Sequence, residues 1–371
     1  MKLSVMQENL ARGLSVVSRA VSNRSTLPVL ANVLLKTEDA GLKLTATNLE
    51  IGITYWVPGK IETDGATTVP AKLLTDLVNS LPAGDRVDLA LQPNDTLDLR
   101  CGRFETHIKG IDAEEFPAIG AAGERPTTRI AQNVLRRALA ETAFAAASDE
   151  ARPILTGVLA KFEGDRLTLA AADNYRIAVR TIDILDPVEA VSVVIPARSL
   201  HELERVLSDT DDPVELVLAQ ARNQVLFHLE GIDIVSRLID GQFPNYQQVL
   251  PASHSTTAEM DREELLRAVR PAALIASSSA NIVKLQVGGD GSGITVTAAA
   301  EVGDYTGDVE ATIEGDPTTI AFNARYLNDV LSNVTADRFS LELNGPLSPG
   351  VFRPVGDGSY VHVVMPVRTT S

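Results

Sequence analysis

The stretch Val69–Leu77, VPAKLLTDL, decides the fold because it returns twice further along the chain. It recurs as Ile195–Leu203, IPARSLHEL, and again as Phe322–Val330, FNARYLNDV, at offsets of 126 and 127 residues. Each copy follows an extended apolar run and opens a short amphipathic helical pattern. Proline suits such a helix entry because its missing N–H would be unpaired there. Self-similarity at a fixed offset indicates tandem copies of one structural unit.

Two further elements keep the same spacing. Leu42–Asn48, LKLTATN, matches Leu167–Asp173, LTLAAAD, and Ile294–Ala299, ITVTAA, is a third version. The dipeptide Phe116-Pro117 returns 127 residues later as Phe243-Pro244. Three independent elements at offsets of 125 to 127 residues predict three diverged copies of a unit of roughly 120 residues.

Each copy is expected to begin with a helix and to carry a second helix at the recurring motif. The predicted helices span residues 7–20, 71–81, 132–147, 197–208, 261–276 and 324–333. Asp261 is a candidate N-cap, with Glu264 three residues further on. Alternating runs such as Val87–Leu91 and Val214–Leu218 predict antiparallel strands. We therefore expect an α+β fold with three tandem domains, 1–122, 129–250 and 257–371, each packing two helices on one face of an antiparallel sheet.

Composition and charge set the broad class. Hydrophobic residues make up 44% of the chain and charged residues 22%, as in ordinary globular proteins. The formal net charge of −16 argues against a simple basic nucleic-acid-binding surface. A single cysteine, Cys101, excludes an internal disulfide. The sequence shows neither a signal-peptide pattern nor a run of the roughly 18 apolar residues that a membrane span needs. A cytoplasmic protein is expected.

Catalytic and cofactor signatures are missing from the sequence. No phosphate-loop pattern occurs, and the glycine-rich segment Gly288–Gly293 lies between two alternating runs, which favours a hairpin turn over a nucleotide site. Cys101 fits a buried thiol in a strand better than a nucleophile. The five histidines have no metal-binding spacing and stand at His107, His201, His228, His254 and His362. We expect no cofactor, no metal and no enzymatic activity.

The net charge hides an uneven distribution. The predicted helices carry eleven basic and nine acidic residues, a surplus of two positive charges, so the rest of the chain carries −18. Arg12, Lys72, Arg136, Arg137 and Arg198 are among the basic residues. For any one helix, basic residues on a solvent-facing surface of an acidic protein explain the positive surplus equally well. Six equivalent helices on one surface would instead give sequence-independent, salt-sensitive contact with a polyanion.

Several motifs together make the sequence resemble the β subunit of bacterial DNA polymerase III, the sliding clamp, along the whole chain. They are Arg24–Leu30, Thr67–Ala71, Ala172–Ala178, Asp240–Tyr246 and Tyr360–Arg368. The resemblance implies a head-to-tail homodimer whose six domains form a closed ring around duplex DNA, with helices towards the hole. A heterologous contact that closes after two subunits does not grow into a filament.

The resemblance also implies roles for individual residues. Arg24 and Lys72 match positions that contact DNA, and Lys72 stands where the family can have arginine. Phe104, Leu274 and Ile275 match apolar positions at the dimer contact. Leu274 and Ile275 also fit the core face of an ordinary helix, and that alternative stays open.

A partner pocket between the second and third domains is implied too. It receives a short peptide that ends in hydrophobic residues, which suits an apolar slot with a few polar rim groups. The matching positions are Leu155, Ala172, Asn174, Tyr175, Arg176, Ile177, Pro244, Val249, Val363, Met365, Pro366 and Arg368. Ala172, Asn174 and Tyr175 replace Thr, Gly and His of the family form, which changes the shape of the slot. Ordinary core packing explains any one of these residues alone.

The implied partners are duplex DNA, the α subunit of the replicative polymerase, the clamp loader, and other polymerases and repair proteins that carry such peptides. ATP-driven ring opening would belong to the loader. Two alternatives remain: a three-domain ligand-binding scaffold, and a clamp-like paralogue that does not form a functional ring. The first would need a polar, ionisable cleft, and the intact Met365-Pro366 speaks against the second.

Overall fold

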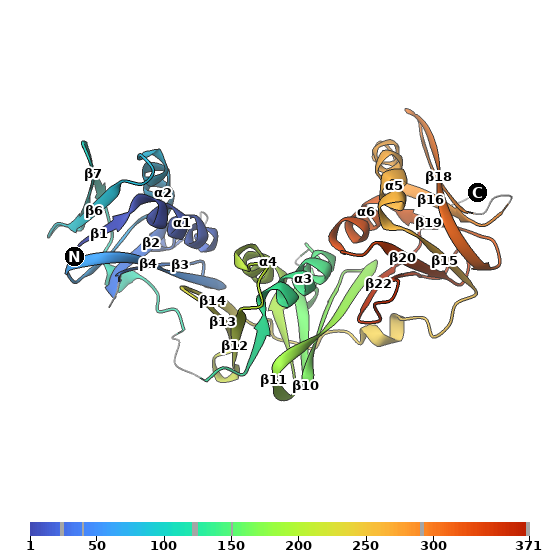
Figure 1. Cartoon of the computed structure of the whole chain (residues 1–371), viewed down its shortest axis with the longest axis horizontal. Helices are drawn as coiled ribbons and strands as arrows, with labels where there is room; N and C mark the ends of the chain where they lie inside the picture. The colour runs from blue at the N-terminus through green and yellow to red at the C-terminus, as the bar shows by residue number, and fades with distance from the viewer. Residues whose placement is uncertain (23–25, 39–40, 121–124, 150, 290–292, 369–371) are drawn as a thin grey trace. The chain divides into compact units, whose positions relative to one another are not determined.

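The computed structural model describes residues 1–22, 26–38, 41–120, 125–149, 151–289 and 293–368. The chain divides into two compact units, unit 1 with Met1–Ile130 and Asp212–Leu238, and unit 2 with Ala131–Asp211 and Ile239–Ser371. Each unit carries helices on one face of an antiparallel sheet (Figure 1), so the predicted α+β class is confirmed. The three domain boundaries stay a prediction, because the units divide the chain differently.

Unit 1 contains two helices and a sheet of twelve strands among the described residues. Its helices are α1 (Gln7–Val17) and α2 (Ala71–Ser80). Its strands are β1 (Lys2–Met6), β2 (Asn32–Glu38), β3 (Gly41–Thr47), β4 (Ile51–Thr63), β5 (Ala66–Pro70), β6 (Arg86–Leu91), β7 (Thr96–Cys101), β8 (Phe104–Lys109), β9 (Thr128–Ala131), β12 (Pro213–Ala219), β13 (Gln224–Leu229) and β14 (Ile232–Arg237).

Helix α1 packs on the sheet through residues at helical spacing. Leu10, Leu14 and Val17 are fully buried, as the 3.6-residue period of an amphipathic helix requires. Gly13 lies on the same face, where a Cβ atom would come within 2.9 Å of the Leu44 side chain. The helix therefore approaches β3 and β4 closely at this residue, and a larger side chain would push it away.

The order of strands in unit 1 shows how the sheet is extended. The main path runs β8-β7-β6-β1-β4-β14-β13-β12-β9, with β2, β3 and β5 off this path. Strands β12 to β14 come from the part of the chain predicted as the second domain, yet β14 pairs antiparallel with β4. Gly52 pairs with Val235 in that register. Backbone hydrogen bonds thus continue the sheet across the predicted domain boundary.

Unit 2 contains four helices and a sheet of ten strands among the described residues. Its helices are α3 (Gln132–Thr142), α4 (Ala197–Val206), α5 (Arg262–Ala276) and α6 (Ala324–Asn333). Its strands are β10 (Gly157–Ala172), β11 (Arg176–Pro196), β15 (Thr256–Asp261), β16 (Ile282–Val287), β17 (Gly293–Ala300), β18 (Gly303–Gly315), β19 (Thr318–Asn323), β20 (Arg338–Leu343), β21 (Gly350–Pro354) and β22 (Tyr360–Val364).

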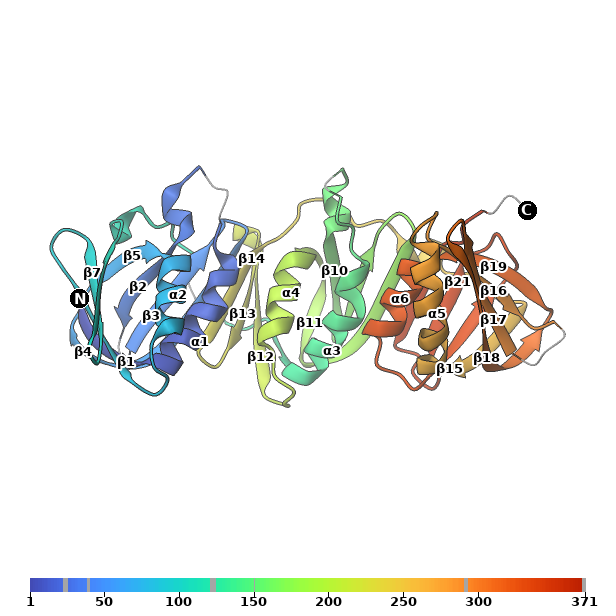
Figure 2. The same ribbon diagram turned by 90° about the horizontal axis from the view of Figure 1, so that it is seen from above.

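A long β10–β11 hairpin links the two halves of unit 2. Strand β22, from the C-terminal part of the chain, pairs antiparallel with β11, and Ile177 stands opposite Val363. The four helices lie in the row α4, α3, α6, α5 on one side of the sheet (Figure 2). Asp261 caps α5 as predicted, since its Oδ1 accepts a hydrogen bond of 2.8 Å from the Glu264 N–H.

Two predicted helices end earlier than expected. The helix predicted for 132–147 ends at Thr142, where φ moves to −122°, and a 3₁₀ turn, η4 (Ala143–Ala145), follows. Helix α1 likewise ends at Val17 before a 3₁₀ turn over Ser18–Ala20. Short 3₁₀ turns are common at helix ends because i→i+3 bonds tighten the last turn.

Strands β16 and β17 pair as an antiparallel hairpin on either side of the glycine-rich segment, of which residues 290–292 lie outside the described part. None of the helices in the described ranges is long and apolar enough to cross a membrane.

Candidate functional site

The turn between β10 and β11 is held by its first residue. Asp173 Oδ1 accepts hydrogen bonds of 2.7 Å from the Tyr175 N–H and 2.9 Å from the Arg176 N–H. Aspartate favours such turns because its short side chain can replace a backbone acceptor. Asn174 and Tyr175 are therefore presented at the tip of the hairpin, and the Tyr175 side chain is 56% exposed.

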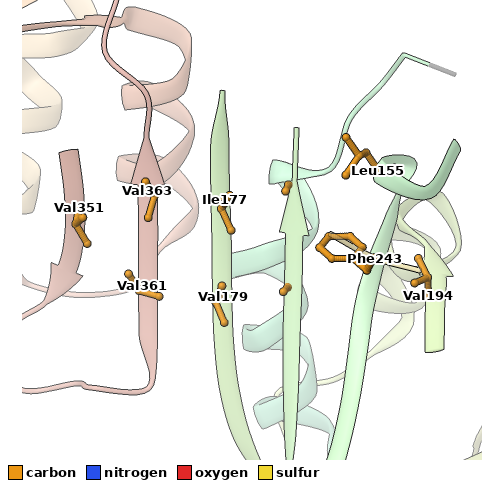
Figure 3. Packing of buried hydrophobic residues seen from close by; sticks show 10 residues of the cluster. Leu155, Ile177, Val179, Val194, Phe243, Val351, Val361 and Val363 are labelled. Atoms are coloured by element: carbon orange, nitrogen blue, oxygen red, sulfur yellow. The ribbon is translucent and has the colours of Figure 1, made fainter. Parts of the chain in front are cut away.

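An apolar cluster lies next to this turn. Leu155 of the 3₁₀ turn η5 (Pro153–Thr156), Ala172, Ile177 and Val363 are buried together in it. Figure 3 shows Leu155, Phe243 and Val194 on one side of Ile177, and Val363, Val361 and Val351 on the other. The structure thus brings together four of the predicted pocket residues, from three separate stretches of chain.

Arg176 does not line the apolar surface as a free cation. Its side chain is 6% exposed, and its Nε donates to Asp173 Oδ2 at 3.0 Å, Nη1 to Asp329 Oδ2 at 2.5 Å and Nη2 to the Phe144 carbonyl at 2.9 Å. The guanidinium also lies 4.7 Å from the centre of the Tyr326 ring. Arginine suits this position because its planar fork satisfies several acceptors at once. Its role is to fix the hairpin against α6.

The other predicted pocket residues are exposed or half-buried. Met365 is at the surface beside the hairpin tip, and its backbone N–H donates to the Tyr175 carbonyl at 2.8 Å. The Tyr175 ring stacks on Tyr326 with centroids 6.1 Å apart. The remaining rim candidates are exposed or half-buried at Asn174, Pro244, Val249, Pro366 and Arg368. Asn174 accepts a hydrogen bond of 3.2 Å from Arg152.

Several residues of this region were not predicted. Phe243 belongs to the buried cluster, and Tyr246 and Leu250 pack against it. The recurrence of Phe116-Pro117 as Phe243-Pro244 contained the signal for Phe243, because a repeated aromatic residue is typical of a core position. Tyr326, which stacks on Tyr175 and Arg176, lies within the repeated motif Phe322–Val330, but no local pattern indicates its partners.

A second ionic network lies behind the cluster. The fully buried Glu141 carboxylate is 2.9 Å from Arg137 Nε and 3.3 Å from Arg180 Nε, and Arg180 Nη1 donates to Asp357 Oδ2 at 2.6 Å. Burial alone would raise the pKa of Asp357, but hydrogen bonds from Ser359 and Arg180 lower it to about 2. The network ties α3 and β11 to the turn before β22.

His362 of β22 is buried in the same region. Its ring stacks on Phe144 with centroids 5.5 Å apart. Burial lowers the pKa of His362 to about 3, and the nearby Arg176 guanidinium acts in the same direction. The imidazole is therefore neutral at physiological pH.

The predicted DNA contacts lie on exposed helix faces, except Arg24, which lies outside the described residues. Arg12, Lys72, Arg136 and Arg198 are exposed. Arg137 is exposed but engaged, since it pairs with Glu141 and donates to the Thr335 carbonyl at 3.0 Å. The exposed basic residues of the six helices are Arg12, Lys72, Arg136, Arg137, Arg198, Arg205, Arg267, Arg270 and Arg325, against the exposed acidic residues Glu8, Asp76, Glu263 and Glu264. The solvent-facing surplus is thus larger than the sequence count, because acids such as Glu141 are buried.

The predicted dimer residues are apolar side chains at a sheet edge and on a helix, and two of the three are exposed. Phe104 begins β8, which ends the strand order of its sheet, and the side chain is 58% exposed. Its partner in the ladder with β7 is the buried Cys101, so the Phe104 side chain points to the helix-covered face of the sheet, where it remains mostly exposed. In unit 2, Leu274 of α5 is 76% exposed and Ile275 is half-buried, so Leu274 is not a core residue of its own unit.

Chemistry of another kind has little support in the described parts of the chain. They contain no group of three or more His, Cys, Asp or Glu side chains placed to hold a metal ion. Burial raises the pKa of the Cys101 thiol, which makes a reactive thiolate less available.

Comparisons with known proteins agree over the whole chain. Models of the DNA polymerase III beta subunit match at residues 1–120 for its N-terminal domain, 129–245 for its central domain and 247–368 for its C-terminal domain. The beta sliding clamps of Synechococcus elongatus and Staphylococcus aureus are 36% and 28% identical, each over 100% of both chains.

Solved structures give the same result. The DNA polymerase sliding clamp from Bacillus subtilis has a TM-score of 0.94 and 29% identity over 100% of both chains. A sliding clamp from Pseudomonas aeruginosa bound to griselimycin has a TM-score of 0.92 and 29% identity, again over 100% of both chains.

The fold and the matched domains define a protein built from tandem DNA-clamp domains. The chain belongs to the DNA polymerase III beta subunit family, the bacterial DNA sliding clamps. It is therefore a processivity factor that encircles DNA and holds a polymerase on it, and it is not an enzyme.

Proposed function

We propose that the hairpin tip and apolar cluster of unit 2 form the docking pocket through which this clamp holds its partners. The observation that carries the proposal is the buried floor of Leu155, Ala172, Ile177 and Val363 beneath the exposed rim of Tyr175 and Met365. A floor that is already apolar, with a few polar groups around it, suits the hydrophobic end of a linear peptide. Methionine at the rim adapts to different peptides because it is unbranched and flexible.

The occupants that fit are short segments of partner proteins that end in large apolar residues. The α subunit of the replicative polymerase, the clamp loader, and other polymerases and repair proteins are the proposed partners. The Tyr175 ring, held against Tyr326, supplies a rigid apolar wall with a hydroxyl group that can reach solvent. Anchoring by a few buried side chains gives each partner a reversible contact and lets partners compete.

The exposed cations of the helices are the proposed contacts with DNA. Lys72, Arg12, Arg136 and Arg198 would meet phosphates without reading sequence, and Arg24 joins them by family correspondence. Arg137 contributes less, because its guanidinium already serves the Glu141 carboxylate and the Thr335 carbonyl. A weak surplus of charge is suitable for a clamp that has to slide, since strong phosphate contacts would hold it in place.

A head-to-tail homodimer is the proposed assembly. Phe104 at the sheet edge of one protomer and Leu274 on α5 are both large apolar side chains that are mostly exposed. Burying the two against each other removes both apolar surfaces from water at about 25 cal/mol per Å². Because the two surfaces differ, the contact is heterologous, and it closes into a ring after two copies. Such a tether of chromosomal DNA is expected in the cytoplasm.

A pocket mutation combined with a DNA assay tests the proposal. Wild-type protein should bind a fluorescent peptide that ends in Leu-Phe at one peptide per chain and keep a polymerase on a primed circular template. Met365→Asp should lose both properties while keeping its mass in solution. A clamp-like paralogue without a functional ring would instead bind the peptide as a monomer and leave polymerase processivity unchanged.

A further inference from the structure

The turn between β3 and β4 repeats the hairpin tip of the peptide pocket. Asn48 Oδ1 accepts hydrogen bonds of 3.0 Å from the Glu50 N–H and 2.9 Å from the Ile51 N–H. Asp173 holds Tyr175 and Arg176 in the same way. The two turns stand 125 residues apart, at the ends of the repeated segments Leu42–Asn48 and Leu167–Asp173.

The strand that joins the sheet beside each turn also keeps the same register. Gly52 pairs with Val235 in unit 1, and Ile177 pairs with Val363 in unit 2. In unit 1 the Arg237 N–H donates to the Glu50 carbonyl at 2.8 Å. In unit 2 the Met365 N–H donates to the Tyr175 carbonyl at 2.8 Å. Unit 1 therefore contains a counterpart of the peptide pocket, built from equivalent backbone.

A small cavity occupies this counterpart. Its volume is about 70 Å³, and its lining includes Thr47, Gly52, Pro117 and Val235. These four residues stand where the peptide pocket has Ala172, Ile177, Pro244 and Val363. Ligand pockets usually measure ~300 Å³ or more, so this slot is nearly filled.

Ile119 fills the slot. Its half-buried side chain packs against Val29, Leu30 and Phe116 on one side and against Val217, Leu226 and Val235 on the other. A Cβ atom on Gly52 would come within 2.8 Å of Ile119 Cγ2. The absence of a side chain at Gly52 therefore makes room for Ile119. In the peptide pocket the position equivalent to Gly52 is occupied by Ile177, which carries a full side chain.

We propose that unit 1 holds a second, closed peptide slot whose ligand is the chain's own segment 116–120, with Ile119 as the hydrophobic anchor. The proposal rests on the proposed function of the unit 2 pocket, from which the slot's chemistry is taken. A tethered anchor acts at a high effective concentration, so an external peptide does not displace it. The chain then offers partners one docking pocket, although the repeat provides two.

Shortening the plug tests this proposal. Ile119→Ala removes most of the anchor and leaves an apolar cavity, which binds an apolar group of suitable size. Calorimetric titration with a linear peptide ending in Leu-Phe should then give two sites per chain, against one for wild type. Leu34→Ala is the matched control, because Leu34 packs against the same cluster as Ile119 without lining the cavity. It should keep one site per chain, and a second site there would contradict the proposal.

The Met365→Asp background separates the two slots. Met365→Asp alone should bind no peptide, and Met365→Asp with Ile119→Ala should regain one site per chain. If wild type binds no peptide, the proposed function is wrong. If wild type binds and the double variant does not, the closed slot is wrong and the pocket assignment stands.

Gly52→Ala tests the same contact from the opposite side without shortening Ile119. The added methyl group would lie 2.8 Å from Ile119 Cγ2, which is too close for van der Waals contact, and should expel the anchor, so amide hydrogen exchange of residues 119 and 120 should become faster than in wild type. Unchanged exchange in a folded Gly52→Ala protein would show that Ile119 is not the anchor.

Discussion

Arg176 and Asp329 form an ion pair that joins β11 to α6, with Nη1 of the arginine 2.5 Å from Oδ2 of the aspartate. Because Arg176 also holds Asp173 at the hairpin tip, this pair connects the rim of the proposed pocket to the helix that carries Tyr326. Stability and peptide binding are therefore expected to depend on the same contact.

Replacing Asp329 by asparagine keeps the shape of the side chain and removes its charge. Asp329→Asn should lower the free energy of unfolding by about 1–2 kcal/mol, because Arg176 is largely buried and loses one charged acceptor while Asp173 remains. Urea unfolding measures the loss. Glu163→Gln is the control, since Glu163 is exposed and pairs with Lys161 at the surface, and it should change stability little. Equal effects of the two variants would contradict the structural role of Arg176.

A charge at Met365 should abolish peptide binding. Met365→Asp places a carboxylate at the rim of the apolar floor, and we expect a loss of at least about 2 kcal/mol, or roughly 30-fold in affinity. Fluorescence anisotropy with a labelled peptide ending in Leu-Phe measures the change. Leu347→Asp is the matched control, because Leu347 is an exposed apolar residue of unit 2 outside the cluster. Binding that survives Met365→Asp would remove the pocket assignment.

The dimer contact is tested at Leu274. Leu274→Asp buries an unpaired charge in the proposed interface and should convert the dimer to a monomer without unfolding it. Sedimentation velocity reports the mass. Leu185→Asp changes another strongly exposed leucine of unit 2 and should leave the dimer intact. A Leu274→Asp protein that remains dimeric would place the interface elsewhere.

Salt dependence tests the DNA-facing cations. Lys72→Glu and Arg136→Glu should each weaken binding to linear duplex, and the slope of log K against log salt should fall in magnitude by about 0.9 for each lost phosphate contact. Lys60→Glu is the control, because Lys60 lies on the face of the sheet away from the helices. It stands opposite Ser4 of β1, whose buried neighbours Leu3 and Val5 point to the helix side. Equal losses for all three variants would mean a general charge effect.

The buried His362 predicts loss of stability in acid. Its pKa in the folded chain is about 3, below the ordinary value of about 6.5, so the unfolded chain binds more protons between these pH values. The stability that comes from burying His362 in its neutral form is fully present above pH 6.5. It is lost as pH falls towards 3, at up to about 1.4 kcal/mol per pH unit. His362→Gln removes this group, and its unfolding free energy should depend less steeply on pH in that window. Parallel pH profiles of the two proteins would contradict the prediction.

The sequence predicted the repeated elements well because their signals are local. The apolar spacing of Leu10, Leu14 and Val17, the Asp261 cap and the prolines that precede α2 and α4 depend on neighbours within one or two turns. Cys101 was likewise predicted to be a buried strand residue, and it is.

The rest depends on contacts between distant segments. The resemblance places Arg176 at the pocket, but the sequence gives no sign of its partners Asp329 and Phe144, which lie 153 and 32 residues away in the chain. The pairing of β14 with β4 and of β22 with β11 has no local signal either, since any antiparallel edge could accept those strands. The part of the helix charge surplus that faces solvent could not be predicted either, because a composition count does not show that Glu141 is buried.

The mass of the purified protein in solution, measured by light scattering with and without a peptide ending in Leu-Phe, tests the central claim most directly. A ring-forming clamp should have about twice the chain mass of 39.6 kDa and bind one peptide per chain without changing its assembly. A protein of single-chain mass that ignores the peptide would contradict both the ring and the pocket.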